Sequence, residues 1–457
     1  MTALSDPARA AARTPDLFGH PRALAFLFAT EMWERFSYYG MRALLTLYMV
    51  NYLLPGRADN VLGLGALRRV LETAFGPLDV QPLASDIYAL YTGFVYLTPI
   101  FGGLLADRVL GHRRTVVLGA SLMALGHFMM AFEPLFLLAL ATLILGNGAF
   151  KPNMSAQVGD LYPPGDGRRD RAYSIFYIGI NLGAFLAPLV CGTLGERAGW
   201  HFGFAAAGVG MLIGLATYLY ASPLLPAERI AAAGDVAQDP LAPADRRAIA
   251  ALIVLFAPVT FFWATYEQQG NTIALWADQQ TDRTLDLLVW SVDIPTTWFQ
   301  AFNPFMIFAF TPFVVALWRS QARRGREPST VVKMAFGCFG VTLSNLIMVA
   351  AALHAGDGKA SWLWLFAYFV VITIGELYIS PIGLSLVSKV APARYLSMLM
   401  GVWLATSFTG NFIAGWLGSF WSGMDKAHFF LMIAVLSGAA GTVILLFNRP
   451  LHAILKH

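Results

Sequence analysis

The stretch EMWERFSYYGMR, residues 31–42, lies inside an apolar run that covers residues 21–53. A run of about 20 apolar residues is long enough to cross the ~30 Å hydrocarbon core of a membrane as a helix. The stretch nevertheless holds two acids and two arginines, although a charge near the bilayer centre costs roughly 2.5–3.5 kcal/mol on insertion scales. We therefore expect these residues to face the polar interior of a helix bundle.

The polar residues of this stretch share one side of the predicted helix. Because successive residues turn by about 100°, one narrow stripe contains Glu31, Glu34, Arg35, Tyr38 and Arg42. Tyr39 lies at the edge of the stripe. A stripe of this kind cannot face lipid, so it predicts a polar interior that other helices also line.

The composition of the whole chain agrees with a membrane protein. It has 457 residues, of which 57% are hydrophobic and 13% charged, and its mean hydropathy is +0.60. These values exclude an ordinary soluble globular protein. Apolar blocks of about 20 residues favour helices over barrel strands, which alternate over ~10 residues. The fold class predicted is an all-α membrane protein.

Twelve apolar blocks predict twelve transmembrane helices. Their centres lie near residues 37, 96, 122, 144, 183, 210, 261, 309, 343, 373, 407 and 437. If both termini are on one side, that side holds 21 of the 31 Lys and Arg residues. The positive-inside rule then places both termini in the cytoplasm, and we expect the chain to lie in the inner, cytoplasmic membrane of the cell.

One long polar interruption divides the chain into halves. The segment 221–247 is rich in Pro, Ala and Asp and predicts a cytoplasmic linker. We expect a six-helix bundle in residues 1–220 and another in residues 248–457. The longest external loop, 54–84, contains RRVLETAFGPL, which predicts a short surface helix.

Other predicted helices also carry buried charges. Together with the first helix, they supply four acids and three bases: Glu31, Glu34, Glu267, Glu376, Arg35, Arg42 and Lys151. One interpretation is a set of ion pairs that only hold helices together. Seven charges exceed what packing needs, and a set that exchanges partners, or is neutralised by H⁺, can switch a protein between conformations.

The motifs resemble those of a known family. EMWERFSYYGMR resembles the ExxERFxYYG motif on helix 1 of the proton-dependent oligopeptide transporters, a branch of the major facilitator superfamily. Five further segments resemble signatures of helices 2 to 10 of that family: GGLLADRVLGHRRT (102–115), FKPNMS (150–155), YSIFYIGINLGAF (173–185), NPF (303–305) and GELYISPIGLS (375–385). The resemblance covers nearly the whole chain and implies uptake of di- and tripeptides with protons, by two six-helix bundles.

The resemblance also implies roles for single residues. Proton coupling is implied for Glu31, Glu34, Arg35 and Glu267. The peptide carboxylate would be bound by Arg35 and Lys151, near Tyr39, Tyr96 and Asn181. The peptide ammonium would be bound by Glu376 and Asn303, and the side-chain pockets would include Trp403 and Ser407. Two ion pairs are implied as gates: Arg42 with Glu267 at the outer side, and Lys151 with Glu376.

Two departures from the family pattern matter. Many members have a histidine on helix 2 where this chain has Ala89, so proton coupling here cannot depend on that histidine. Many bacterial members also have two extra helices between the halves, and the linker 221–247 is too short and polar to hold them. We therefore expect the minimal twelve helices.

Other functions are less well supported by the residues. A transporter of the same fold for an amino acid, nitrate or a drug would keep the acidic motif but would not need Lys151 opposite Glu376. A membrane-embedded enzyme would need a nucleophile with a base, or a metal set, and we find neither; a peptide receptor would not need four buried acids. We expect no cofactor, no metal and no nucleic-acid partner, and a monomer in the lipid bilayer that binds peptides and protons.

Overall fold

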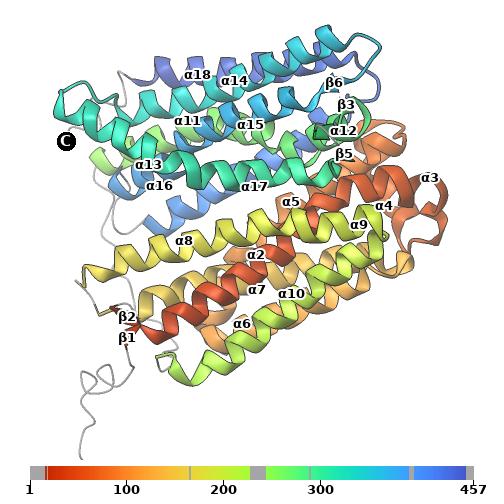
Figure 1. Ribbon diagram of the computed structural model, residues 1–457. Helices are drawn as coiled ribbons and strands as arrows, with labels where there is room; N and C mark the ends of the chain where they lie inside the picture. Colours follow the sequence, from red (N-terminus) through yellow and green to blue (C-terminus); the bar gives the residue numbers. More distant parts are fainter. Residues whose placement is uncertain are drawn as a thin grey trace, which may run out of the picture.

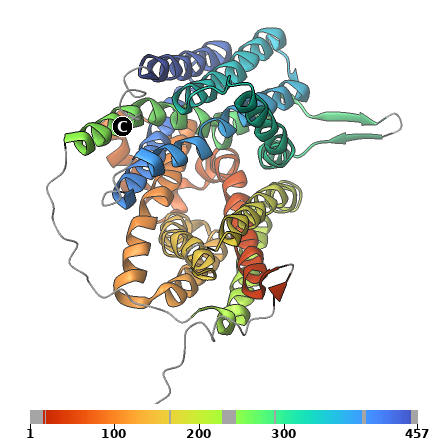
Figure 2. The ribbon, with the colours of Figure 1, turned by 90° about the vertical axis from the view of Figure 1, so that its left-hand side faces the viewer.

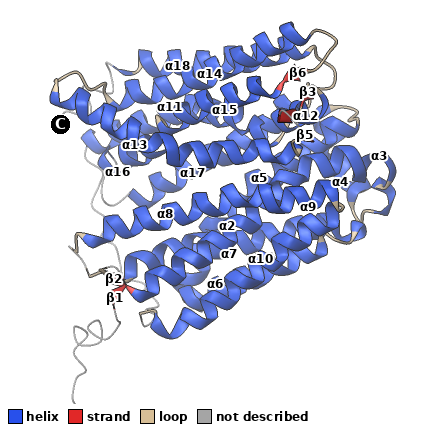
Figure 3. Ribbon diagram, in the orientation of Figure 1, coloured by secondary structure: helices blue, strands red, loops and turns tan. Residues whose placement is uncertain are grey.

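The computed structural model describes residues 16–17, 19–163, 166–226, 243–287, 290–390 and 396–448. Most of these residues are helical, and the strands are short (Figure 3). Every expected centre lies in a helix: α2 (Arg22–Tyr48), α5 (Val80–Leu105), α6 (His112–Met129), α7 (Phe136–Asp160), α8 (Arg168–Ala187), α10 (Trp200–Ala221), α11 (Pro243–Tyr266), α13 (Phe302–Arg323), α14 (Thr330–Ala355), α15 (Trp362–Leu377), α17 (Leu396–Gly418) and α18 (Lys426–Leu446).

In the described part of the chain, nine helices are long and apolar enough to cross a membrane. The chain is therefore a multi-pass membrane protein. Helix α2 is not among the nine, and it is the helix that carries the charged stripe. The full count of twelve spans stays a prediction, since α6 and α17 are also outside that set.

Short elements extend the long helices. They are η1 (Met49–Leu53) and α3 (Leu54–Gly56) after α2, η3 (Ala106–Leu110) after α5, η5 (Pro188–Gly192) and α9 (Thr193–Arg197) after α8, η7 (Glu267–Gly270) and α12 (Thr272–Gln279) after α11, η8 (Thr296–Ala301) before α13, and α16 (Ser380–Val390) after α15. Single turns form η2 (Ala58–Asn60), η4 (Glu133–Leu135) and η6 (Ser222–Leu224). The predicted surface helix is confirmed as α4 (Leu64–Phe75).

The strands form three small pairs. They are β1 (Asp16–Leu17) with β2 (His20–Pro21), β3 (Thr281–Asp282) with β6 (Ala360–Ser361), and β4 (Thr284–Leu287) with β5 (Trp290–Asp293). The pair β3–β6 is parallel, whereas β4–β5 is an antiparallel hairpin that pairs Leu285 with Val292. This hairpin projects sideways from the bundle when the molecule is viewed along its helices (Figure 2).

The helices form two layers that lie side by side (Figure 1). One core of buried apolar side chains draws on residues 23–225, and a second draws on residues 252–444 together with Leu47. Between the layers, α5 packs against α17 and α8 packs against α13. Helix α11 begins at Pro243, and residues 227–242 of the predicted linker lie outside the described part, so the boundaries at 221–247 stay a prediction.

The two ends of the bundle differ. We call one of them the α4 end, because α4, α9 and α12 lie there (Figure 1). The strands β1 and β2 and the last residues of α18 lie at the opposite end (Figure 1). The distribution of Lys and Arg predicts that the α4 end faces outside.

The tenth predicted helix is broken in two. Helix α15 ends at Leu377, and α16 begins again at Ser380. Pro381 explains the restart, because proline has no N–H to donate and its fixed φ suits the first turn of a new helix. The last residue of α15, Leu377, directly follows the predicted site residue Glu376, so the break lies next to the site.

Candidate functional site

The charged stripe of α2 is buried, and its members contact one another. The Arg35 guanidinium donates from Nη2 to Glu34 Oε1 at 2.6 Å and from Nε to the other oxygen of the same carboxylate. It also forms an ion pair with Glu31, at 3.3 Å between Nε and Oε1. Asn147 of α7 donates to Glu34 Oε1 at 3.0 Å. In this conformation Arg35 is occupied by two acids of its own helix.

A glycine of α8 lets a second helix approach the stripe closely. A Cβ atom at Gly183 would lie 2.2 Å from the carbonyl oxygen of Met32 and 3.0 Å from the Cβ of Arg35. Any larger residue would push α8 away from α2. The close approach explains why a glycine occupies position 183: it allows α8 to lie directly beside the acidic motif of α2.

Lys151 of α7 has a different surrounding from the one expected. Its ammonium lies over the ring of Tyr96, 4.7 Å from the centroid, which is within the range of a cation–π interaction. Between described residues it forms no ion pair, with Glu376 or with another acid. The predicted pairing of Lys151 with Glu376 is therefore not formed in this conformation and stays a prediction.

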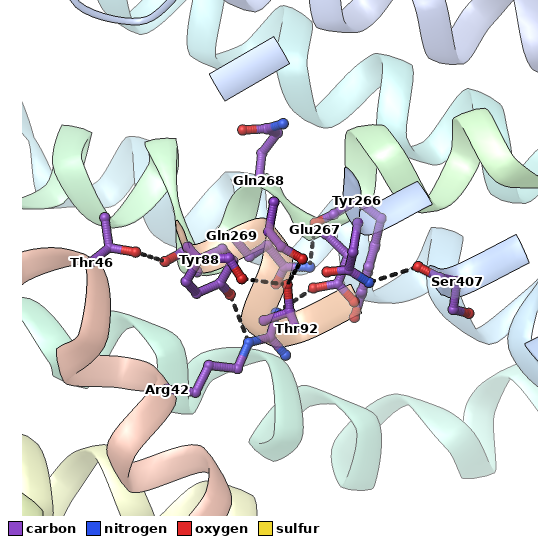
Figure 4. A network of polar contacts seen from close by, with 12 residues as sticks. Arg42, Thr46, Tyr88, Thr92, Tyr266, Glu267, Gln268, Gln269 and Ser407 are labelled. Carbon is purple, nitrogen blue, oxygen red and sulfur yellow. Dashed lines mark hydrogen bonds and ion pairs between the residues drawn. The ribbon is translucent and has the colours of Figure 1, made fainter. Parts of the chain in front are cut away.

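Arg42 and Glu267 form the ion pair that the family resemblance implies. The Arg42 Nη2 atom forms an ion pair with Glu267 Oε2 between α2 and η7. Arg42 Nε also donates to the Tyr88 hydroxyl at 2.7 Å, and Thr46 donates to the carbonyl oxygen of Gly270 at 2.8 Å (Figure 4). Arg42 and Glu267 are 225 positions apart in the sequence and join the two halves of the chain.

Further polar contacts close the α4 end. Asn51 donates to Asp278 at 2.9 Å, and Ser85 donates to Asn271 at 2.9 Å. Gln81 donates to the carbonyl oxygen of Gly418 at 2.9 Å. Together with the Arg42–Glu267 pair, these hydrogen bonds join residues 19–226 to residues 243–448 at this end of the bundle. The structure is thus a conformation in which the α4 end is closed.

Glu376 lies where three helices of the second half meet. It accepts hydrogen bonds from the Tyr266 hydroxyl at 2.5 Å and from Asn303 Nδ2 at 2.9 Å. Asn303 also donates to the Thr373 hydroxyl at 3.0 Å. Its two hydrogen-bond donors are neutral, so Glu376 has no counter-ion among the described residues and its carboxylate is available to a cation.

The other residues predicted to line the peptide site contact neighbouring protein groups or are buried in this conformation. Tyr39 is half-buried and packs edge-on against Tyr38, with 5.1 Å between ring centroids. Asn181 is buried and donates to the carbonyl oxygen of Tyr177 at 3.0 Å. Trp403 and Ser407 of α17 are each almost fully enclosed, at 3% and 4% exposed. In this conformation both side chains are therefore covered by other parts of the protein.

The sequence did not reveal three residues of this site. They are Tyr88, Asn147 and Tyr266, which donate to or accept from Arg42, Glu34 and Glu376. Asn147 could have been found, because it precedes Lys151 by one helical turn and shares its face. The two tyrosines lie in apolar stretches and have no local signal.

The fold and the buried charges between two helix bundles define a transporter of the major facilitator type. Comparison with known proteins refines this class. A family model described as "POT family" matches residues 113–239 and 226–431. A di-/tripeptide transporter of Lactococcus lactis subsp. cremoris is 34% identical over 95% of this chain and 96% of its own length. The peptide transporter YePEPT of Yersinia enterocolitica is 33% identical over 88% of each chain.

Comparison with solved structures identifies the same kind of protein as comparison of sequences. The structure of a variant of peptide transporter POT bound to alafosfalin is 31% identical, with a TM-score of 0.83 over 99% of this chain and 100% of that chain. The same variant in complex with sulfate has a TM-score of 0.83 at 30% identity, over 98% and 99% of the two chains. The chain therefore belongs to the POT family.

Proposed function

We propose that this protein is a symporter that couples the inward movement of protons to the uptake of di- and tripeptides by alternating access. The observation that carries the proposal is the separation of charge across the bundle. The bases Arg35 and Lys151 come from the first half, and the acid Glu376 comes from the second half. A zwitterionic peptide needs a positive and a negative pole in this arrangement, and relatives of this chain are named as peptide transporters.

The proton would act on the acids that now hold Arg35. Protonation of Glu31 or Glu34 removes the charge that attracts the guanidinium, which frees Arg35, together with Lys151, for a peptide carboxylate. Peptide release on the inside would reverse the exchange. One proton moving down 100 mV releases ~2.3 kcal/mol, enough for about 50-fold accumulation of a neutral solute.

The finer assignments belong to the same proposal. We assign twelve spans, with bundles in residues 1–220 and 248–457 and a linker at 221–247. Both termini are assigned to the cytoplasmic side of the inner membrane, which agrees with the position of β1 and the end of α18 at one end of the bundle (Figure 1). The peptide would lie near Tyr39, Tyr96, Asn181, Trp403 and Ser407, and the working unit would be the monomer.

A pH gradient across proteoliposomes tests the proposal directly. With an acidic exterior, the purified protein should accumulate a labelled dipeptide above its equilibrium level, and a protonophore should abolish the accumulation. Unlabelled dipeptides should compete, whereas free amino acids and nitrate should not. Absence of proton-dependent accumulation for every di- and tripeptide tested would contradict this function and leave the family assignment intact. Competition by nitrate or amino acids instead would favour the transporter of another solute.

Glu376→Gln tests the site for the peptide ammonium. The amide oxygen can still accept from Tyr266 and Asn303, but the negative charge is lost. Because hydrogen bonds to charged groups contribute ~1.5–3 kcal/mol, dipeptide affinity should fall by about 10- to 100-fold. An N-acetylated dipeptide, which has no ammonium, serves as the control and should bind the variant and the unchanged protein equally weakly. An unchanged affinity for the free dipeptide would remove Glu376 from the site.

A further inference from the structure

Glu196 connects the two halves of the chain through its carboxylate. It lies in α9, and its two oxygens accept three hydrogen bonds from residues of η8. The backbone N–H groups of Thr296 and Thr297 donate at 2.8 Å each, and the Thr297 hydroxyl donates at 2.7 Å. Since η8 runs directly into α13, this carboxylate holds the beginning of a helix that belongs to the other half.

The three donors explain why this contact is strong. The first N–H groups of a helix have no partner within the helix, and a negative charge near a helix start is stabilised by the helix dipole. Hydrogen bonds to an ionised acceptor are shorter and stronger than neutral ones. Arg283 adds a cation 3.7 Å from the Glu196 carboxylate.

The segments around Glu196 are also in very close contact. A Cβ atom at Gly192 would lie 2.0 Å from the Thr297 hydroxyl oxygen, so η5 and η8 could not approach in this way with a larger residue. Trp298 Nε1 donates to the Thr193 hydroxyl at 2.8 Å. Arg197 reaches the carbonyl oxygen of Asp293 at 3.3 Å. The contact is therefore an extended interface between α9 and the start of α13.

This interface is separate from the pair Arg42–Glu267. That pair joins α2 to η7, whereas Glu196 joins α9 to η8. Helix α9, which carries Glu196, lies at the α4 end (Figure 1). Opening of this end requires that α9 and η8 separate, and separation leaves the donors of Thr296 and Thr297 without the Glu196 carboxylate.

We propose that Glu196 is a second latch of the α4 end, a positioning residue that holds α13 against α9 and must release η8 before this end can open. The proposal rests on the alternating access proposed above. Glu196 has no contact with the charged residues assigned to the peptide, so it controls how often the α4 end is closed and leaves peptide recognition to other residues.

A distance measurement between the halves tests the latch. Spin labels are attached to cysteines that replace Arg69 on α4 and Lys359 before β6, both of which are exposed at the α4 end. The native cysteines, Cys191 and Cys338, are buried and do not take up the label. Pulsed electron paramagnetic resonance in nanodiscs then reports the populations with short and long distances. The measurement needs no peptide and no proton gradient, so the latch can fail or succeed independently of the proposed function.

Glu196→Ala should increase the ratio of long-distance to short-distance molecules by roughly ten-fold or more, because three hydrogen bonds to a charged acceptor are lost. Glu196→Gln should show a smaller increase, since its amide oxygen can still accept. Glu133→Gln is the matched control. Glu133 is similarly exposed at the same end, but it accepts from Tyr52 at 2.8 Å and pairs with Arg57 at 3.1 Å, both within the first half. This control should leave the distances unchanged.

The outcomes decide between a latch and a contact that only supports the local fold. A purified, monodisperse Glu196→Ala variant with unchanged distances would overturn the latch. If that variant does not fold, Thr297→Val removes only the hydroxyl donor and should shift the populations in the same direction by a smaller amount; no shift there would also overturn it. In the double variant the two effects should not add, because both changes remove the same hydrogen bond.

Discussion

Glu34→Gln is expected to abolish uptake driven by a pH gradient while leaving exchange of labelled for unlabelled dipeptide across the membrane. The amide oxygen can still accept from Asn147 and from Arg35 Nη2, so these two hydrogen bonds of the 0% exposed Glu34 side chain are kept, whereas the Arg35 Nε donor loses its acceptor. It cannot bind and release a proton, however. Glu31 would then be the only acid paired with Arg35, whatever the pH. Substrate transport would no longer be coupled to proton movement.

Two assays on the same proteoliposomes separate these effects. Accumulation under an imposed pH gradient should fall to the level of protein-free vesicles, whereas counterflow with peptide on both sides should continue. Glu133→Gln, another acid of the first half that lies far from the stripe in the sequence, should retain both activities. Retained gradient-driven accumulation in Glu34→Gln would contradict the proton assignment.

Arg42→Ala, which removes the cation of the Arg42–Glu267 ion pair, is expected to destabilise the closed α4 end strongly. It leaves the Glu267 carboxylate, at 2% exposed, without its cation. Removing one partner of a buried ion pair costs about 3–5 kcal/mol, because an uncompensated charge stays buried. The variant should therefore show a clearly lower thermal unfolding temperature in detergent and lose most of its uptake.

The double variant Arg42→Met with Glu267→Gln provides the control for this prediction. Both charges are then absent, and side chains of similar size fill the space, so most of the stability should return. Transport should stay low if the ion pair also serves as a gate. Full stability of the single Arg42→Ala variant would show that the pair contributes little to the closed state.

Much of the fold was predictable because it depends on local patterns. Apolar blocks of membrane-spanning length located a helix at each expected centre, and the surface helix after residue 63 was recognised as well. The helical period placed the charges of residues 31–42 on one face before any partner was known. The apolar run 21–53 also located α2, which is not among the nine helices of the described chain that length and composition alone mark as spans.

The candidate site was predictable only in part. Family motifs led to Glu31, Glu34, Arg35 and Glu376, and the structure shows that the first three contact one another. The expected pairing of Lys151 with Glu376 is not formed in this conformation, since Lys151 lies over Tyr96 instead. A pair that breaks and forms during a transport cycle cannot be assigned to one state from the sequence.

By itself, the sequence determined that the chain crosses a membrane many times, where its helices lie, and which charges face inward, because these depend on hydrogen bonds and hydrophobicity within one helix. Only the tertiary structure decided that Tyr88 accepts from Arg42, that Tyr266 donates to Glu376, and that Glu196 holds the start of α13. Such contacts depend on which faces of distant helices meet, as where Gly192 leaves room for the side chain of Thr297 at the α4 end.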